Sequence, residues 1–123
     1  MISRLVLAFV GGCLGGGARL TIGLVWDTGT GIPWQLLVIN LVGSFMIGVV
    51  AVLWGGRRHL WPLLGPGLLG GFTTFSGIAA MGYVTDSGAL VSVAVLIVSM
   101  LVCTLAAWAG FALAERRRMR AAA

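Results

Sequence analysis

Long apolar runs alternate with short polar connections along this 123-residue chain. Four runs carry no charge or almost none, at about residues 5–26, 32–56, 60–85 and 89–114. Each run is long enough to cross a bilayer as an α-helix, which takes about 20 apolar residues. The connections between the runs are too short to hold a soluble domain. The pattern therefore predicts an all-α membrane protein of four transmembrane helices, with residues 1–123 forming a single domain.

The third run contains a sequence that disfavours a continuous helix. Residues 70–76 read GGFTTFS, which combines two glycines with three hydroxyl side chains. Irregular backbone is not tolerated where it faces hydrocarbon, but it persists where protein buries it or where it lines a polar cavity. A helix broken inside the membrane is therefore a candidate ion or solute site.

The composition supports a membrane protein. Hydrophobic residues make up 59% of the chain and charged residues only 9%, whereas soluble domains carry about 25% charged residues. Arg4 followed by an apolar run resembles a cleaved signal peptide. The five glycines between residues 11 and 17 would weaken such a signal helix, so we expect the first run to be a retained span.

The placement of charge predicts the orientation. All eight cationic side chains are arginines, at Arg4, Arg19, Arg57, Arg58, Arg116, Arg117, Arg118 and Arg120. With four spans, all of these except Arg19 fall on one side of the membrane, and the opposite connections carry Asp27 and Asp86. The positive-inside rule then predicts a multi-pass protein of the cell membrane with both termini in the cytoplasm. The basic tail is suited to anionic lipid heads rather than to nucleic acid.

Polar side chains inside the spans mark a candidate path. Asn40 lies midway along the second run, and Ser44 is four residues further on the same helical face. A lone amide in hydrocarbon is costly unless it is paired, so Asn40 either bonds another helix or lines a solute path. Ser92, Ser99 and Cys103 also share one face of the fourth span. With Thr74 and Ser76, these residues indicate a polar track.

The chemistry of the track favours a small anion. The acidic residues Asp27, Asp86 and Glu115 all lie at span ends, which disfavours a small proton-coupled drug exporter, because such a transporter needs a buried carboxylate. Hydroxyl, amide and backbone N–H groups are hydrogen-bond donors, and the ring edges of Phe72 and Phe75 carry partial positive charge. Arg19 either attracts an anion toward an entrance or extends its charge to the interface.

Small residues predict close helix packing. Gly11 with Gly15, Gly12 with Gly16, and Ser44 with Gly48 are small residues four apart, a spacing that lets membrane helices approach closely. We interpret Cys13 and Cys103 as small packing residues, because their spacing indicates neither a metal site nor a disulfide framework.

Three motifs together resemble the Fluc (CrcB) family of fluoride channels. Residues 11–19 (GGCLGGGAR) are similar to that family's GGxxGxxxR pattern, residues 40–45 (NLVGSF) to its NxxGSF pattern, and residues 70–76 to its GGxTTFS pattern. The motifs occur in order, and the resemblance covers all four spans. It implies a passive fluoride channel rather than an enzyme, built as an antiparallel dimer, which relieves fluoride toxicity by letting fluoride leave the cytoplasm.

The resemblance also implies individual roles. The backbone carbonyls of Gly70 and Thr73 match positions that hold a structural Na⁺, which is not transported, at the centre of the dimer. Asn40 matches the pore asparagine and Phe75 the first phenylalanine of the aromatic box. Ser99 falls near the polar track of the fourth span.

The chain departs from the family pattern in two respects. Gly77 stands where the family has a hydroxyl, and Ile78 stands where it has a second box phenylalanine. In addition, an antiparallel homodimer needs one chain inserted both ways, whereas this chain has a strong arginine bias. We therefore expect pairing with an oppositely oriented paralogue. A small multidrug-type transporter and a non-conducting partner subunit remain as alternative functions.

Overall fold

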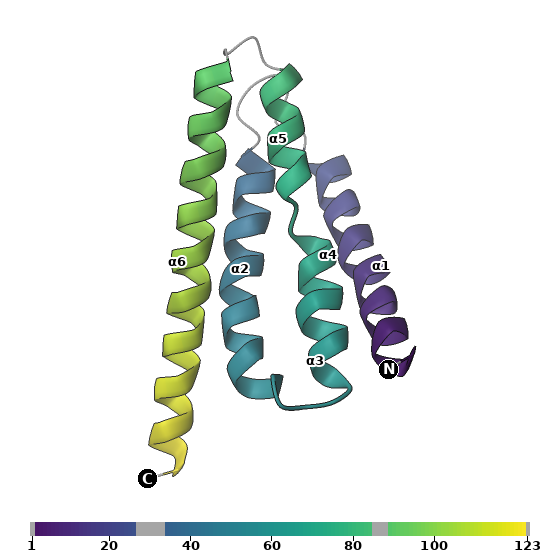
Figure 1. Ribbon diagram of the computed structural model, residues 1–123, viewed down its shortest axis with the longest axis vertical. Helices are drawn as coiled ribbons and strands as arrows, with labels where there is room; N and C mark the ends of the chain where they lie inside the picture. The colour runs from purple at the N-terminus through teal and green to yellow at the C-terminus, as the bar shows by residue number, and fades with distance from the viewer. Residues whose placement is uncertain (1, 27–33, 85–88, 123) are drawn as a thin grey trace.

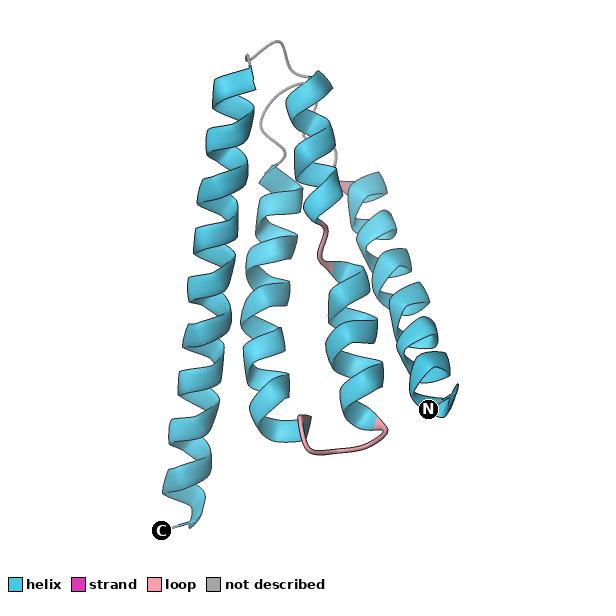
Figure 2. Cartoon of the chain, in the orientation of Figure 1, coloured by secondary structure: helices cyan, strands magenta, loops and turns pink. Residues whose placement is uncertain are grey.

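The computed structural model describes residues 2–26, 34–84 and 89–122, and this part of the chain is almost entirely helical (Figure 2). The elements are α1 (Ile2–Val25), α2 (Trp34–Trp54), α3 (Leu60–Pro62), η1 (Leu63–Leu69), α4 (Gly70–Phe72), α5 (Phe75–Val84) and α6 (Ala89–Ala122). The all-α class is confirmed. Among the described residues, α1, α2 and most of α6 are long and apolar enough to cross a membrane as single helices.

The predicted third span is divided into four short elements. Pro66 lies inside η1, a π-helical segment, and the N–H of Gly70 bonds the carbonyls of Gly65 and Gly67. Proline lacks the N–H that a regular turn requires, which accounts for the widened turn here. Thr73 has extended backbone with ψ of 153°, and it separates α4 from α5. The non-helical part of the seven-residue motif is therefore confined to Thr73 and Thr74.

The segments lie side by side in the order α6, α2, the α3–α5 segment and α1 (Figure 1). Helix α2 packs along α6, while α1 packs against η1 and α4. The N-terminus, the turn between α2 and α3, and the C-terminus all lie at one end of the molecule. This places at one end every arginine except Arg19, whereas Asp27 and Asp86 lie outside the described residues.

Glycines set the closest helix contacts. A Cβ on Gly11 or Gly15 would meet the backbone of η1 at Leu63 or Leu68, and a Cβ on Gly48 would meet the backbone of α6 at Ala107. The predicted roles of Gly11, Gly15 and Gly48 are thus confirmed. Gly12 has open space on its own Cβ side, but a Cβ on Gly71 of α4 would meet the backbone of Gly12, so α1 and α4 also approach closely there.

The chain by itself buries little apolar surface. Only Ile39, Val50, Leu69, Ile78 and Ala114 form its buried hydrophobic core among the described residues. Large apolar side chains on α1 and α6, such as Phe9 and Leu105, are exposed. Lipid or another chain must cover these surfaces in the folded protein.

Helix α6 extends beyond the predicted span end at Ala114 as far as Ala122. Its last turns carry exposed arginines, and arginine and alanine are both good helix formers in water. The basic tail is therefore a projecting helix rather than an irregular segment.

Candidate functional site

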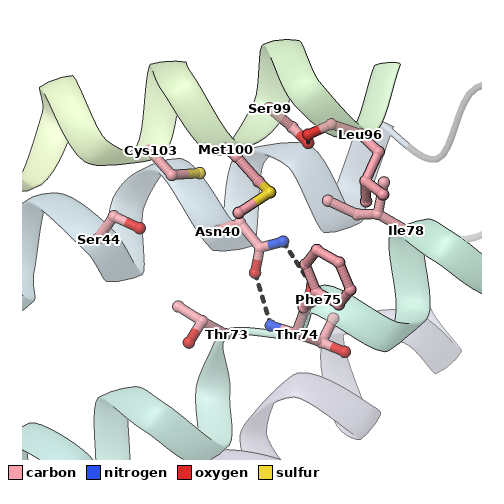
Figure 3. A pocket seen from close by; sticks show the side chains of 10 residues that line it. All are labelled: Asn40, Ser44, Thr73, Thr74, Phe75, Ile78, Leu96, Ser99, Met100 and Cys103. Carbon is pink, nitrogen blue, oxygen red and sulfur yellow. Dashed lines mark hydrogen bonds between the residues drawn. The ribbon is translucent and has the colours of Figure 1, made fainter. Parts of the chain in front are cut away.

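A cavity of about 180 Å³ lies where α2, α5 and α6 meet the connection between α4 and α5 (Figure 3). Its polar lining consists of Asn40, Ser44, Thr73, Thr74, Ser99 and Cys103. Phe75, Ile78, Leu96 and Met100 supply the apolar lining. The cavity thus gathers side chains from three parts of the sequence, and most of the polar residues predicted to form a track lie around it.

The amide of Asn40 pairs with the backbone of Thr74. Its Oδ1 accepts a hydrogen bond from the Thr74 N–H at 2.7 Å, and its Nδ2 donates to the Thr74 carbonyl at 2.7 Å. Both residues are buried, at 6% and 9% exposure. Asn40 therefore supplies hydrogen-bond partners for the N–H and C=O of Thr74, which the interrupted helix would otherwise leave buried and unpaired. The predicted interhelical hydrogen bond is present, and Asn40 also lines the cavity.

Thr74 also caps the start of α5. Its Oγ1 accepts a hydrogen bond from the N–H of Gly77 at 3.0 Å and lies 3.4 Å from the Ser76 Oγ. This is the geometry of a helix N-cap, in which a hydroxyl satisfies a free N–H of the first turn. Ser76 itself is exposed and does not line the cavity, so its predicted place in the track is not reproduced in this single chain.

Gly77 occupies a crowded position. A Cβ there would lie 2.9 Å from the Thr74 Cγ2 and 3.1 Å from the Leu36 Cδ1. Such distances require the neighbouring side chains to move. A glycine at position 77, rather than a residue with a hydroxyl side chain, therefore fits the packing of Thr74 and Leu36.

Ser99 reaches the cavity from α6, but its hydroxyl is engaged. The Ser99 Oγ donates to the Leu96 carbonyl at 2.9 Å, one turn earlier in the same helix. This back-bonding is common for serine in membrane helices. Ser92 does not line the cavity, whereas Cys103, which follows Ser99 by four residues, does. Cys103 thus lines the cavity from the helical face that it was predicted to share with Ser99.

The two phenylalanines of the motif lie in different places. Phe75 lines the cavity and is 58% exposed. Phe72 instead lies close to Gly43 on α2 and does not line the cavity. Ile78 follows Phe75 by one turn of α5, lines the cavity and is 6% exposed.

Arg19 does not line this cavity. Its Nε is buried and has no hydrogen-bond partner among the described residues, and the Oε1 of Gln35 is in the same condition. Buried polar atoms without partners are uncommon in folded proteins. Gln35 was not singled out from the sequence, because a polar residue at the start of a span is usually interfacial.

The carbonyls of Gly70 and Thr73 lie at the interruption. In a regular helix the Gly70 carbonyl would accept the Thr74 N–H, but that N–H is donated to Asn40. The Gly70 carbonyl then has a contact of 3.5 Å from the Thr73 Oγ1, and the extended Thr73 takes its own carbonyl out of the helical pattern. Side-chain clusters of His, Cys, Asp or Glu suited to a metal are absent from the described residues.

Comparison with known proteins agrees with these motifs. The family model described as "CrcB-like protein, Camphor Resistance (CrcB)" matches residues 6–111. A relative from Cutibacterium acnes, named fluoride-specific ion channel FluC 1, is 39% identical over 112 residues, covering 83% of this chain and 78% of the relative. A relative from Xanthomonas euvesicatoria, named fluoride-specific ion channel FluC, is 47% identical over 81 residues.

The extent of the matches differs among relatives. The alignment with the Xanthomonas protein covers 61% of this chain and 61% of that protein. The alignment with FluC 2 of Nocardia farcinica, at 49% identity, covers 54% of this chain and 51% of that protein. The chain thus spans about three fifths and about half of these two relatives. Because the family match includes α1, α2, the α4–α5 connection and the cavity-lining part of α6, this chain belongs to the CrcB family.

Proposed function

We propose that this chain is a subunit of a passive, fluoride-selective channel of the cell membrane. The observation that carries the proposal is the position of Asn40. One of its two Nδ2 hydrogens bonds the Thr74 carbonyl. The other hydrogen has no acceptor among the described residues, and Asn40 lines the cavity. A donor held rigidly in a narrow path can replace part of the hydration shell of a small anion.

The surroundings of Asn40 support an anion over a cation. Phe75 brings an aromatic ring to the cavity, and ring edges carry partial positive charge. Glu115 is the one acidic residue among the described residues, and it is exposed in the tail of α6. The names of the relatives favour fluoride among small anions.

Passive conduction would protect the cell from fluoride. In acidic surroundings HF crosses lipid and dissociates inside, so fluoride accumulates above its external concentration. A channel that lets the anion leave needs no coupling carboxylate, in contrast to a proton-coupled exporter. The multidrug-type transporter is therefore the weaker alternative.

We further propose that the chain works as an antiparallel dimer, with an oppositely oriented paralogue as its partner. The small buried core and the exposed apolar side chains of α1 and α6 support association with another chain. The gathering of arginines at one end supports a single insertion direction for this chain. A non-conducting partner subunit remains an alternative. Ile78 favours this alternative, because it stands where the family resemblance implies a phenylalanine.

The carbonyls at the interruption suit a structural Na⁺ in such a dimer. Carbonyl oxygens are ligands that hard cations prefer, and Asn40 releases the Gly70 carbonyl by taking the Thr74 N–H. Gly70 and Thr73 of one chain offer too few oxygens for a complete shell, so a second copy of the site would have to supply the rest. The ion would contribute positive charge and cohesion at the dimer centre.

Fluoride efflux from liposomes tests these proposals. The purified chain is reconstituted alone and together with a paralogue whose arginines lie in the opposite connections, and release is compared for fluoride and chloride. We expect fluoride release only with both chains. Release with the chain alone would overturn the mixed dimer. Chloride release equal to fluoride release would overturn fluoride selectivity, and no release in either case would overturn the channel assignment.

A further inference from the structure

A second concave site lies at the end of the molecule that carries the arginines. It is a cleft of about 470 Å³ between the end of α2 and the tail of α6, lined by Val52, Leu53, Gly56, Arg57 and Arg118. We refer to these five residues as the arginine cleft. A Cβ on Gly56 would meet no atom within 4 Å, so the glycine leaves the cleft open where the chain turns away from α2.

Two arginines from different elements line the arginine cleft. Arg57 belongs to the turn after α2, where its N–H bonds the Trp54 carbonyl at 2.9 Å, and Arg118 belongs to α6. Neither is in an ion pair within the described part of the chain. Glu115, one turn before Arg118, lines the adjoining cleft together with Arg118. Paired guanidinium forks match the geometry of a phosphate group, which they bind through charge-assisted hydrogen bonds.

The position of the arginine cleft relative to the bilayer indicates which class of phosphate-bearing molecule would bind. Helix α2 has 21 residues, about 30 Å at 1.5 Å per residue, which equals the hydrocarbon thickness. Helix α6 has 34 residues and therefore measures about 50 Å, and it continues past the turn between α2 and α3 (Figure 1). Arg57 and Arg118 then lie at headgroup level, while Val52 and Leu53 face the hydrocarbon boundary.

We propose that the arginine cleft is a binding site for one anionic phospholipid of the phosphatidylglycerol class. The phosphate lies between Arg57 and Arg118, and the glycerol and upper acyl chains lie along Val52 and Leu53. The lipid would join the end of α2 to the tail of α6, because each supplies one of the two cations. This site is independent of what the cavity around Asn40 conducts.

Native mass spectrometry of the full chain in detergent tests the site. Retained phosphatidylglycerol and phosphatidylcholine are compared for the unaltered chain, for Arg57→Gln/Arg118→Gln and for the matched control Arg58→Gln/Arg116→Gln. Both variants remove one cation from the turn and one from α6, but only the first alters the arginine cleft. We expect the first variant to lose about tenfold of the retained phosphatidylglycerol, and the control to lose less than about twofold.

The other outcomes overturn the proposal. An equal loss in both variants would mean that charge attracts lipid without a defined site. Equal retention of phosphatidylcholine, whose phosphate is offset by a positive choline, would show that the cleft does not select a net anionic lipid. Displacement of the lipid by millimolar inorganic phosphate would identify a site for a soluble anion. Thermal unfolding of each variant is measured in parallel, and phosphatidylglycerol should raise the midpoint of the control but not that of Arg57→Gln/Arg118→Gln.

Discussion

Asn40 and Thr74 are held together by two hydrogen bonds of 2.7 Å, in which the side-chain amide of one residue pairs with both backbone polar groups of the other. The pair joins α2 to the point where the third helical segment is interrupted. An amide side chain here imitates a peptide group, so the interruption is buried with its N–H and C=O satisfied. In the proposed channel, the second Nδ2 hydrogen of this amide would bind the anion, so one residue would serve both the stability of the interruption and conduction.

Replacing Asn40 by alanine is expected to destabilise the protein and to abolish fluoride efflux. Both backbone groups of Thr74 would lose their partner, at about 1–3 kcal/mol for each buried group. Thermal unfolding and liposome efflux measure the two effects. Ser44→Ala is the control, since it changes the same cavity without altering the pair, and an unchanged unfolding midpoint in Asn40→Ala would contradict the structural role.

Thr74→Val should weaken the start of α5. The substitution keeps the shape of the side chain but removes the Oγ1 that accepts the Gly77 N–H, at a cost of about 0.5–2 kcal/mol for a lost N-cap. Thr74→Ser retains the hydroxyl and should unfold close to the unaltered protein. Destabilisation by serine without destabilisation by valine would indicate that the methyl group, rather than the cap, matters at this position.

Gly15→Ala and Gly17→Ala are expected to act in opposite directions. A Cβ on Gly15 meets the backbone of Leu68, which can move only if α1 separates from η1, and overpacking of this kind costs about 1–3 kcal/mol. A Cβ on Gly17 meets nothing within 4 Å, so alanine there should be neutral or gain up to about 1 kcal/mol from helix propensity. Unfolding midpoints of the two variants compare the effects directly, and equal midpoints would refute close packing of α1.

Cys103 offers a test of the cavity as an ion path. It lines the cavity and is half-buried, whereas Cys13 is exposed on α1. In a Cys13→Ser background, a small methanethiosulfonate reagent should modify Cys103 and reduce fluoride efflux. The protein with only Cys13 should remain active after the same treatment, and inhibition of that protein instead would place the path elsewhere.

Ile78→Phe should raise fluoride efflux through this subunit. The side chain lines the cavity one turn after Phe75, so a ring there would add a second edge with partial positive charge. Ile78→Leu is the matched control for a change of shape without an aromatic ring. If flux is the same for both variants, the missing aromatic residue does not limit conduction.

The helices could be predicted because hydrophobicity along the chain reports membrane crossing directly. The second run, at about 32–56, becomes α2 at Trp34–Trp54, and the fourth begins at Ala89 as expected. The side-by-side placement of Asn40 and Ser44 followed from their spacing by four residues. The end of α6 was missed because a charged helix in water has no apolar signal to mark its length.

The motif at residues 70–76 was harder to resolve. The interruption at Thr73 and Thr74 separates the helical phase of α4 from that of α5, so spacing alone could not place Phe72 and Phe75 relative to each other. The structure turns Phe72 toward Gly43 and Phe75 toward the cavity. The two hydrogen bonds from Asn40, which is distant in the sequence, and the packing of Phe72 near Gly43 accompany this rotation of the two parts.

The sequence by itself determined the membrane class, the helical segments, the end that carries the arginines and the polar residues available for a path. These properties depend on composition and on local spacing, which a linear chain displays. The tertiary structure decided that Asn40 pairs with Thr74, that Cys103 and Ile78 line the same cavity, and that Arg57 and Arg118 line one cleft. Such relationships depend on how helices rotate and approach one another, and close packing sets those contacts across long sequence separations.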